Sequence, residues 1–128
     1  MSYYFSKILQ VPYDEAVARV TEELKKEGFG IITEIDVKET LRKKLDVEFR
    51  KYKILGACNP QAAYQALLKE DKIGTMLPCN VIVQELTAGG VEVAAIDPIA
   101  SMQAVKNPEL QGLAEHVQAK LKKVIDNL

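Results

Sequence analysis

The apolar positions near the end of the chain recur with the period of an α-helix. They begin after Asn107-Pro108 and fall three and four residues apart, so that one face of the segment is apolar. An asparagine accepts a first-turn N–H, and a proline beside it loses no hydrogen bond at a helix start. We therefore predict a long amphipathic helix whose buried face consists of Leu110, Leu113, Ala114, Val117, Leu121, Val124, Ile125 and Leu128.

Three further helices follow from similar signals. Asn59-Pro60 repeats the asparagine–proline start and predicts a helix that continues to about Lys69. Pro12 opens another helix, with apolar residues on one face, and Gly28 is expected to end it in a left-handed conformation. The segment 37–45 predicts a short helix.

Runs of branched and aromatic residues predict five strands, at residues 3–9, 30–36, 52–58, 79–86 and 91–96. Gly89-Gly90 between the last two indicates a hairpin, which makes those strands antiparallel. Helices and strands alternate without any linker that would divide the chain. We predict one α+β domain over residues 1–128, with a mostly antiparallel five-stranded sheet and the helices on one face.

A sheet with helices on one face leaves its other face uncovered. A second copy of the chain is the simplest cover, so we predict a homodimer. The aromatic residues Tyr3, Tyr4 and Phe5 are candidates for this contact, although they also suit a core.

Composition narrows the partners and the compartment. Seventeen basic residues against eighteen acidic ones give a net charge of −1, which argues against a dedicated nucleic-acid binder. No apolar run approaches the roughly 20 residues of a membrane span, and the start MSYYFSKILQ lacks a secretory h-region. We expect a cytoplasmic protein with no membrane partner, whose cysteines are free thiols and whose folding needs no cofactor.

Two cysteines carry the clearest candidate chemistry, because each ends or begins a predicted strand and is followed by an asparagine. Cys58 precedes the helix that starts at Asn59, and a helix N-terminus stabilises a thiolate. Cys79 shares a strand face with Val81, whereas Asn80 belongs to the other face. Both thiols also suit the alternative of small apolar core residues, since unbridged cysteine is commonly buried.

The functional hypothesis is a ligand-binding or thiol-bearing module, with a redox or soft-metal role. In it, Cys58 is the more reactive thiol and Cys79 is a resolving thiol or a second ligand for zinc or copper. Asn59 and Asn80 orient a small polar or anionic ligand. The alternative is a non-catalytic homodimeric interaction protein with both cysteines structural. The sequence decides neither for nor against an enzyme.

Other candidates are weaker. His116, the only histidine, is a weak metal ligand or a solvated helix residue. The basic segment 38–53 offers a second alternative function, anion or nucleic-acid binding, or forms a charged solvated face. Glu34 and Asp36 share a strand face and suit either a cation site or a solvated surface, and Asp97 suits a turn start.

Several separate motifs resemble the signature stretches of the domain-of-unknown-function 302 family. They are YKILGACNP at 52–60, LPCNV at 77–81 and AIDP at 95–98, in the order that the family shows. The resemblance implies a β-α-β4-α fold of the TATA-box-binding-protein-like class, and a dimer. It implies no activity. Asp46 stands where a glycine is common in the family.

Overall fold

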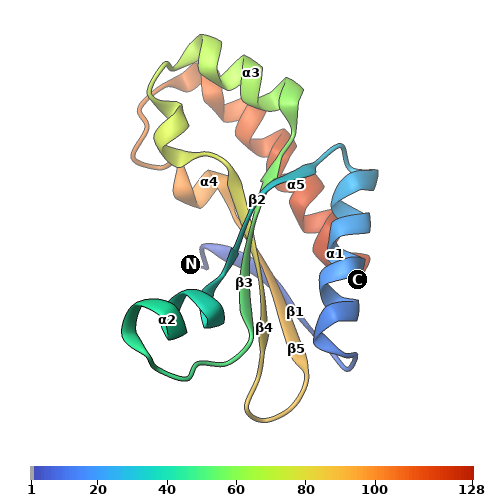
Figure 1. Ribbon diagram of the computed structural model, residues 1–128. Helices are drawn as coiled ribbons and strands as arrows, with labels where there is room; N and C mark the ends of the chain where they lie inside the picture. The colour runs from blue at the N-terminus through green and yellow to red at the C-terminus, as the bar shows by residue number, and fades with distance from the viewer. Residues whose placement is uncertain (1) are drawn as a thin grey trace.

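The computed structural model describes residues 2–128, and one antiparallel sheet organises them (Figure 1). The strand order is β1-β5-β4-β3-β2, and every neighbouring pair is antiparallel. The strands are β1 Tyr4–Leu9, β2 Gly30–Asp36, β3 Tyr52–Cys58, β4 Cys79–Glu85 and β5 Val91–Ile96. The predicted α+β class and five-stranded antiparallel sheet are confirmed.

Five α-helices and two short 3-10 turns connect the strands. The helices are α1 Tyr13–Lys26, α2 Val37–Leu45, α3 Pro60–Lys69, α4 Pro98–Ser101 and α5 Gln111–Asp126, and the turns are η1 Ile73–Met76 and η2 Pro108–Leu110. Asn107 does act as a cap, but it caps η2 by accepting the Glu109 N–H at 3.0 Å, and α5 begins three residues after Pro108. None of the helices in residues 2–128 has the length and apolarity to cross a bilayer.

Helices α1 and α5 cover one face of the sheet, and their aliphatic stripes form the main core with it (Figure 1). Val20 and Leu24 of α1 and Leu121 of α5 are fully buried. They pack with the alternate residues of the central strands that point the same way, which are Val81, Val83, Val93 and Ala95.

The helices are not all on that face. Helix α2 follows β2 on the other side of the sheet from α1 and has no buried residue (Figure 1). Its C-cap Asp46 has a φ of 54°, in the left-handed region where glycine is favoured. This conformation explains why a glycine is common at position 46 in the family whose motifs the chain resembles.

The uncovered sheet face has few charges. A row of residues crosses it from β2 to β1, with Ile35, Ile54, Ile82, Ala94 and Ser6 as successive cross-strand partners. A polar chain lies beside this row, because Arg50 Nε donates to Gln84 Oε1 at 2.8 Å and Gln84 Nε2 donates to Glu92 Oε1 at 2.8 Å. The face is thus poor in charge, and its one charged strand residue, Glu92, is bonded to Gln84.

Gly56 on β3 provides a test of the packing at the end of the sheet. A methyl group there would overlap Thr33 Oγ1 and lie 2.7 Å from Pro78 Cγ. We expect Gly56→Ala to lower the free energy of unfolding by about 1–3 kcal/mol, the usual cost of overpacking. Gly30→Ala is the matched control, because nothing lies within 4 Å of its added carbon. Urea unfolding followed by circular dichroism measures both, and equal stability of the two variants would contradict this packing.

Candidate functional site

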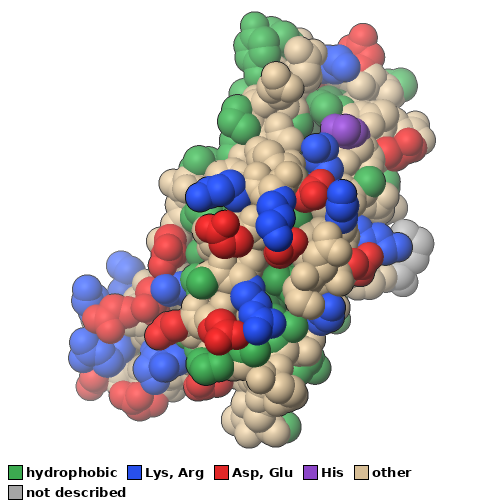
Figure 2. Space-filling view, turned by 90° about the vertical axis from the view of Figure 1, so that its right-hand side faces the viewer, with side chains coloured by type: hydrophobic (Ala, Val, Ile, Leu, Met, Phe, Trp, Pro, Cys, Tyr) green, Lys and Arg blue, Asp and Glu red, His purple; other side chains and the backbone are tan. Residues whose placement is uncertain are grey.

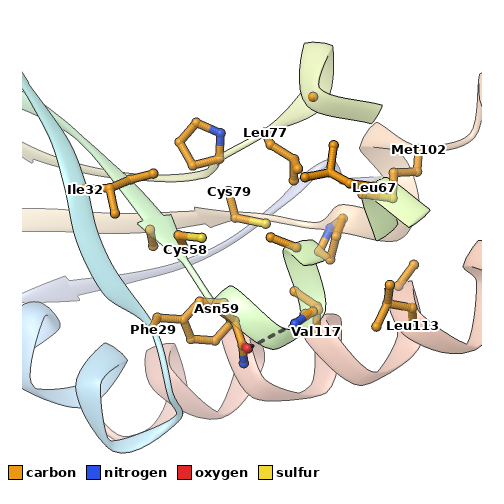
Figure 3. Close-up of a pocket in the computed structure, with 17 residues that line it drawn as sticks. Phe29, Ile32, Cys58, Asn59, Leu67, Leu77, Cys79, Met102, Leu113 and Val117 are labelled. Atoms are coloured by element: carbon orange, nitrogen blue, oxygen red, sulfur yellow. Dashed lines mark hydrogen bonds between the residues drawn. The ribbon is translucent and has the colours of Figure 1, made fainter. Parts of the chain in front are cut away.

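A cavity of about 360 Å³ opens beside the end of the sheet where β3 ends and β4 begins (Figure 3). It lies between two separate apolar clusters. Phe29 and Val117 belong to the main core, whereas Leu77, Met102 and Leu113 pack against a smaller cluster formed by Ala66, Ile73 and Leu110. The cavity exists because α3 and the turns after it close over the end of the sheet, and of α3 only Ala62 packs against the main core.

The side chains that line the cavity are almost all apolar. No Lys, Arg, Asp, Glu or His side chain lines it, and the polar side-chain groups are one carboxamide and two thiols. The other lining residues are Phe29, Ile32, Ala57, Ala62, Ala63, Leu67, Gly74, Leu77, Pro78, Pro98, Met102, Leu113, Ala114 and Val117. Concave apolar pockets of this size are typical of small-molecule sites.

The two cysteines meet in this cavity. Cys79 is the cross-strand partner of Ala57, so it lies beside Cys58, and the sulfur atoms of both are directed into the hollow (Figure 3). They form no disulfide, and both are half-buried. The structure therefore brings together the two thiols that stand twenty-one residues apart in the sequence.

The surroundings of Cys79 favour its protonated form. Burial, with a smaller contribution from the Cys58 thiol, raises the pKa of the Cys79 thiol from 9.0 to about 11, which leaves it protonated at neutral pH. The first turn of α3 has few free backbone N–H groups that could stabilise a thiolate at Cys58. Pro60 has no N–H. The N–H groups of Ala62 and Ala63 already donate to Asn59, to its side-chain oxygen at 3.3 Å and its carbonyl oxygen at 2.9 Å respectively. Only the Gln61 N–H is left in the first turn.

The two predicted asparagines do not share the cavity. Asn59 lines it, but its carboxamide oxygen is occupied as the cap of α3. Asn80 lines a different hollow, on the uncovered sheet face with Tyr52 and Ile82. The expectation that Asn80 and the cysteines form one mouth is wrong, because successive residues of a strand point to opposite faces.

His116 does not reach the thiols either. It is exposed on α5 and lines a smaller outer hollow with Gln61, Gln65 and Lys120. Among residues 2–128, no group of three or more His, Cys, Asp or Glu side chains is placed to hold a metal ion. The combination of Cys58, Cys79 and His116 as metal ligands is therefore not assembled.

The carboxylates with candidate cation roles have structural partners. Glu34 pairs with Lys53 at 2.9 Å, and Asp36 caps α2 by accepting the Glu39 N–H at 3.0 Å. Asp97 accepts from the Ile99 N–H and from Gln118 Nε2, both at 3.0 Å. These bonds favour structural roles for all three carboxylates.

Several basic residues of the segment 38–53 form ion pairs with acidic residues of the same segment. Arg42 and Lys43 both lie within 3.7 Å of Glu39, and Lys38 lies 3.9 Å from Glu48. The helix-covered side of the molecule shows the same mixture of both signs (Figure 2). This pattern favours a solvated charged surface over a continuous site for a polyanion.

Sequence reasoning missed most of the cavity wall. Ile32 stands at a β-bulge and is 61% exposed, and Leu67 on α3 is 44% exposed, so both present apolar surface at the cavity rim. Leu113 and Val117 were assigned to a helix face only. The apolar stripe of α5 correctly places both on the inner side of the helix, but no pattern shows that they face a hollow.

The protonated state of Cys79 can be tested with a disulfide reagent. In Cys58→Ala, which retains only Cys79, we expect slow labelling at pH 8 and a rate whose midpoint stays above pH 9, because burial, the larger cause of the raised pKa, remains. Cys79→Ala, which retains Cys58, is the matched variant, and both in denaturant give the rate of an ordinary thiol. A midpoint at or below pH 9 for folded Cys58→Ala would contradict the described surroundings of Cys79.

Comparison with known proteins agrees with the motifs. A crystal structure of an uncharacterized conserved protein DUF302 from Bacillus stearothermophilus is similar to this chain with a TM-score of 0.90 and 27% sequence identity, and the match covers 98% of both chains. No curated protein matches the chain. A family model described as "Domain of unknown function DUF302" matches residues 5–128. Since that match spans nearly the whole sequence, the chain belongs to the DUF302 family.

Proposed function

We propose that this protein binds a small, largely apolar molecule in the cavity that contains Cys58 and Cys79. The observation that carries the proposal is a hollow of about 360 Å³ whose wall bears no charged side chain. At about 30 Å³ for each water-sized group, this volume suits a ligand of roughly a dozen non-hydrogen atoms.

The rim of the cavity supports the same proposal. Ile32 and Leu67 keep large exposed surfaces where a ligand would enter, although burying them inside the fold would stabilise the protein. Tyr64 and Leu68, also on α3, are 61% and 64% exposed. Exposed apolar groups around an apolar hollow are characteristic of sites that accept apolar partners.

The thiols then act as soft, apolar wall groups. A protonated Cys79 behaves as a small hydrophobe with a weak donor, which suits contact with a hydrocarbon ligand. This replaces the expected polar ligand held by two asparagines. Free thiols at a ligand site also fit the proposed cytoplasmic, reducing compartment.

Filling the cavity tests the proposal. Ala63 lines the hollow, and Ala63→Phe adds an aromatic ring inside it. We expect wild-type protein to bind 1-octanol in isothermal titration calorimetry and Ala63→Phe to lose at least tenfold in affinity. Ala119→Phe, on the exposed side of α5, is the matched control and should bind as the wild type does. No binding of octanol to the wild type, or equal binding to all three proteins, would refute the proposal.

A second proposal, homodimerisation, rests on the uncovered sheet face. Of the side chains on that face, Glu92 is the charged one within the strands, and it is bonded to Gln84. Five strands about 4.8 Å apart and six residues long give a face of roughly 24 by 20 Å. A specific interface needs about 800 Å² from each partner. The sheet supplies over half of this area, and α2, which lies on the same side, can supply the remainder.

A charge on this face should separate the copies. We expect Ile82→Lys to sediment as a monomer at concentrations where the wild type sediments as a dimer, because burying an added charge at the seam carries a desolvation cost. Ala18→Lys, on the exposed side of α1, is the control and should remain dimeric. Wild-type protein that stays monomeric throughout a concentration series would exclude this interface.

A further inference from the structure

The apolar cavity has a polar neighbour on the other side of the contact between α3 and α5. This outer hollow holds about 240 Å³ and is lined by Asn59, Gln61, Ala62, Gln65, Leu113, His116 and Lys120. Asn59, Ala62 and Leu113 line the apolar cavity as well. The two hollows therefore adjoin where α3 contacts α5, and Ala62 is the smallest of the side chains that they share.

The geometry of α5 explains why two unlike sites lie so close together. Leu113 and Val117 are one turn apart and face the cavity, whereas His116 and Lys120 follow the adjacent line along the helix and face the outer hollow. Val117 and Lys120 are separated by less than one turn, about 5 Å along the axis. A molecule of modest length can therefore contact both.

Lys120 carries the charge of the outer hollow. Its Nζ is 3.4 Å from the carbonyl oxygen of Glu27, and among residues 2–128 no carboxylate lies within 4.0 Å of it. The Glu27 carboxylate is bound by Lys123 at 3.5 Å. Lys120 is also half-buried, so a charge-assisted bond there is screened less than one at an open surface.

The other side chains of the hollow add donors of the same kind. Gln61 and Gln65 carry carboxamide N–H groups, and His116 adds a ring N–H. No Asp or Glu lines the hollow. The histidine is visible at the molecular surface on the helix-covered side (Figure 2). A cation surrounded by neutral donors and free of lining carboxylates is suited to an anion.

We infer that the ligand of the apolar cavity is amphipathic, with a hydrocarbon body against Val117 and a carboxylate or similar anionic head bound by Lys120. This inference rests on the proposed function, because it concerns the same ligand. In this proposal the body reaches the outer hollow at Ala62, the smallest of the three side chains that line both hollows, and its head lies outside the contact of α3 with α5. Such a ligand contacts the apolar cavity wall and also gives Lys120 a carboxylate partner, which it does not have among residues 2–128. Neither a pure hydrocarbon nor a free inorganic anion does both.

Three eight-carbon probes that differ only in their heads test the inference. We expect octanoate to bind on the order of fivefold more tightly than 1-octanol in isothermal titration calorimetry, the scale of a partly exposed ion pair, and octylamine to bind more weakly than either. Lys120→Gln should reduce octanoate to the affinity of octanol and leave octanol unchanged. Lys122→Gln is the matched control, because that lysine is exposed on the same helix and lines neither hollow.

The outcomes separate the two proposals. If octanol and octanoate bind equally, or if Lys120→Gln leaves octanoate unchanged, the anionic head is refuted and the apolar site stands. If neither compound binds to the wild type, the apolar site is refuted and the inference with it. Urea unfolding of Lys120→Gln should match the wild type, and a supporting result requires this match.

Discussion

The structure depends on one packing interaction, the burial of a single sheet face under two amphipathic helices. Leu24 of α1 and Leu121 of α5 are inaccessible to solvent and contact the same valine layer of the central strands. Burial of aliphatic side chains is the main source of stability in a domain of this size, at about 1.5–3 kcal/mol for each large one. The two helices cover the middle of the sheet, but the sheet ends at Cys58 and Cys79, and beyond that end α5 faces α3 across the cavity.

The remaining features follow from that limit. Helix α3 and the turns after it close over the end of the sheet, yet α3 buries only Ala66, in a cluster of its own. A cavity is left between this cluster and the main core. The other sheet face receives no helix with a buried residue, since α2 has none. The two proposed binding surfaces are thus the two places where the main packing interaction stops.

Much of the fold was predictable from local signals, because those signals act through the backbone. The asparagine–proline starts, the left-handed Gly28 with φ of 86°, and the hairpin at Gly89 with φ of 100° depend on a few neighbouring residues. Strand alternation also separates Asn80 from Cys79. The cavity was not predictable, since it depends on how far α3 stands from α5 and on the bulge that exposes Ile32. Distances between elements far apart in the sequence leave no local pattern.

The two thiols show that the surroundings of a cysteine determine its reactivity. A cysteine beside a helix start suggests an activated nucleophile, but the cap residue and the proline of α3 use or remove most of the first-turn donors. The apolar wall raises the pKa of Cys79 and so favours its neutral form. The burial that favours the neutral thiol of Cys79 also suits the cavity to a hydrocarbon ligand in the proposed function.

The most direct test of the central claim is methyl NMR spectroscopy during titration with 1-octanol. If the gap between the two apolar clusters is the ligand site, the methyl signals of Leu67, Leu113 and Val117 should shift in a saturable way. Those of Val20 and Leu24, in the filled part of the core, should stay fixed. Shifts confined to Ile82 and Ile96 on the uncovered sheet face, or no shifts at all, would contradict the account.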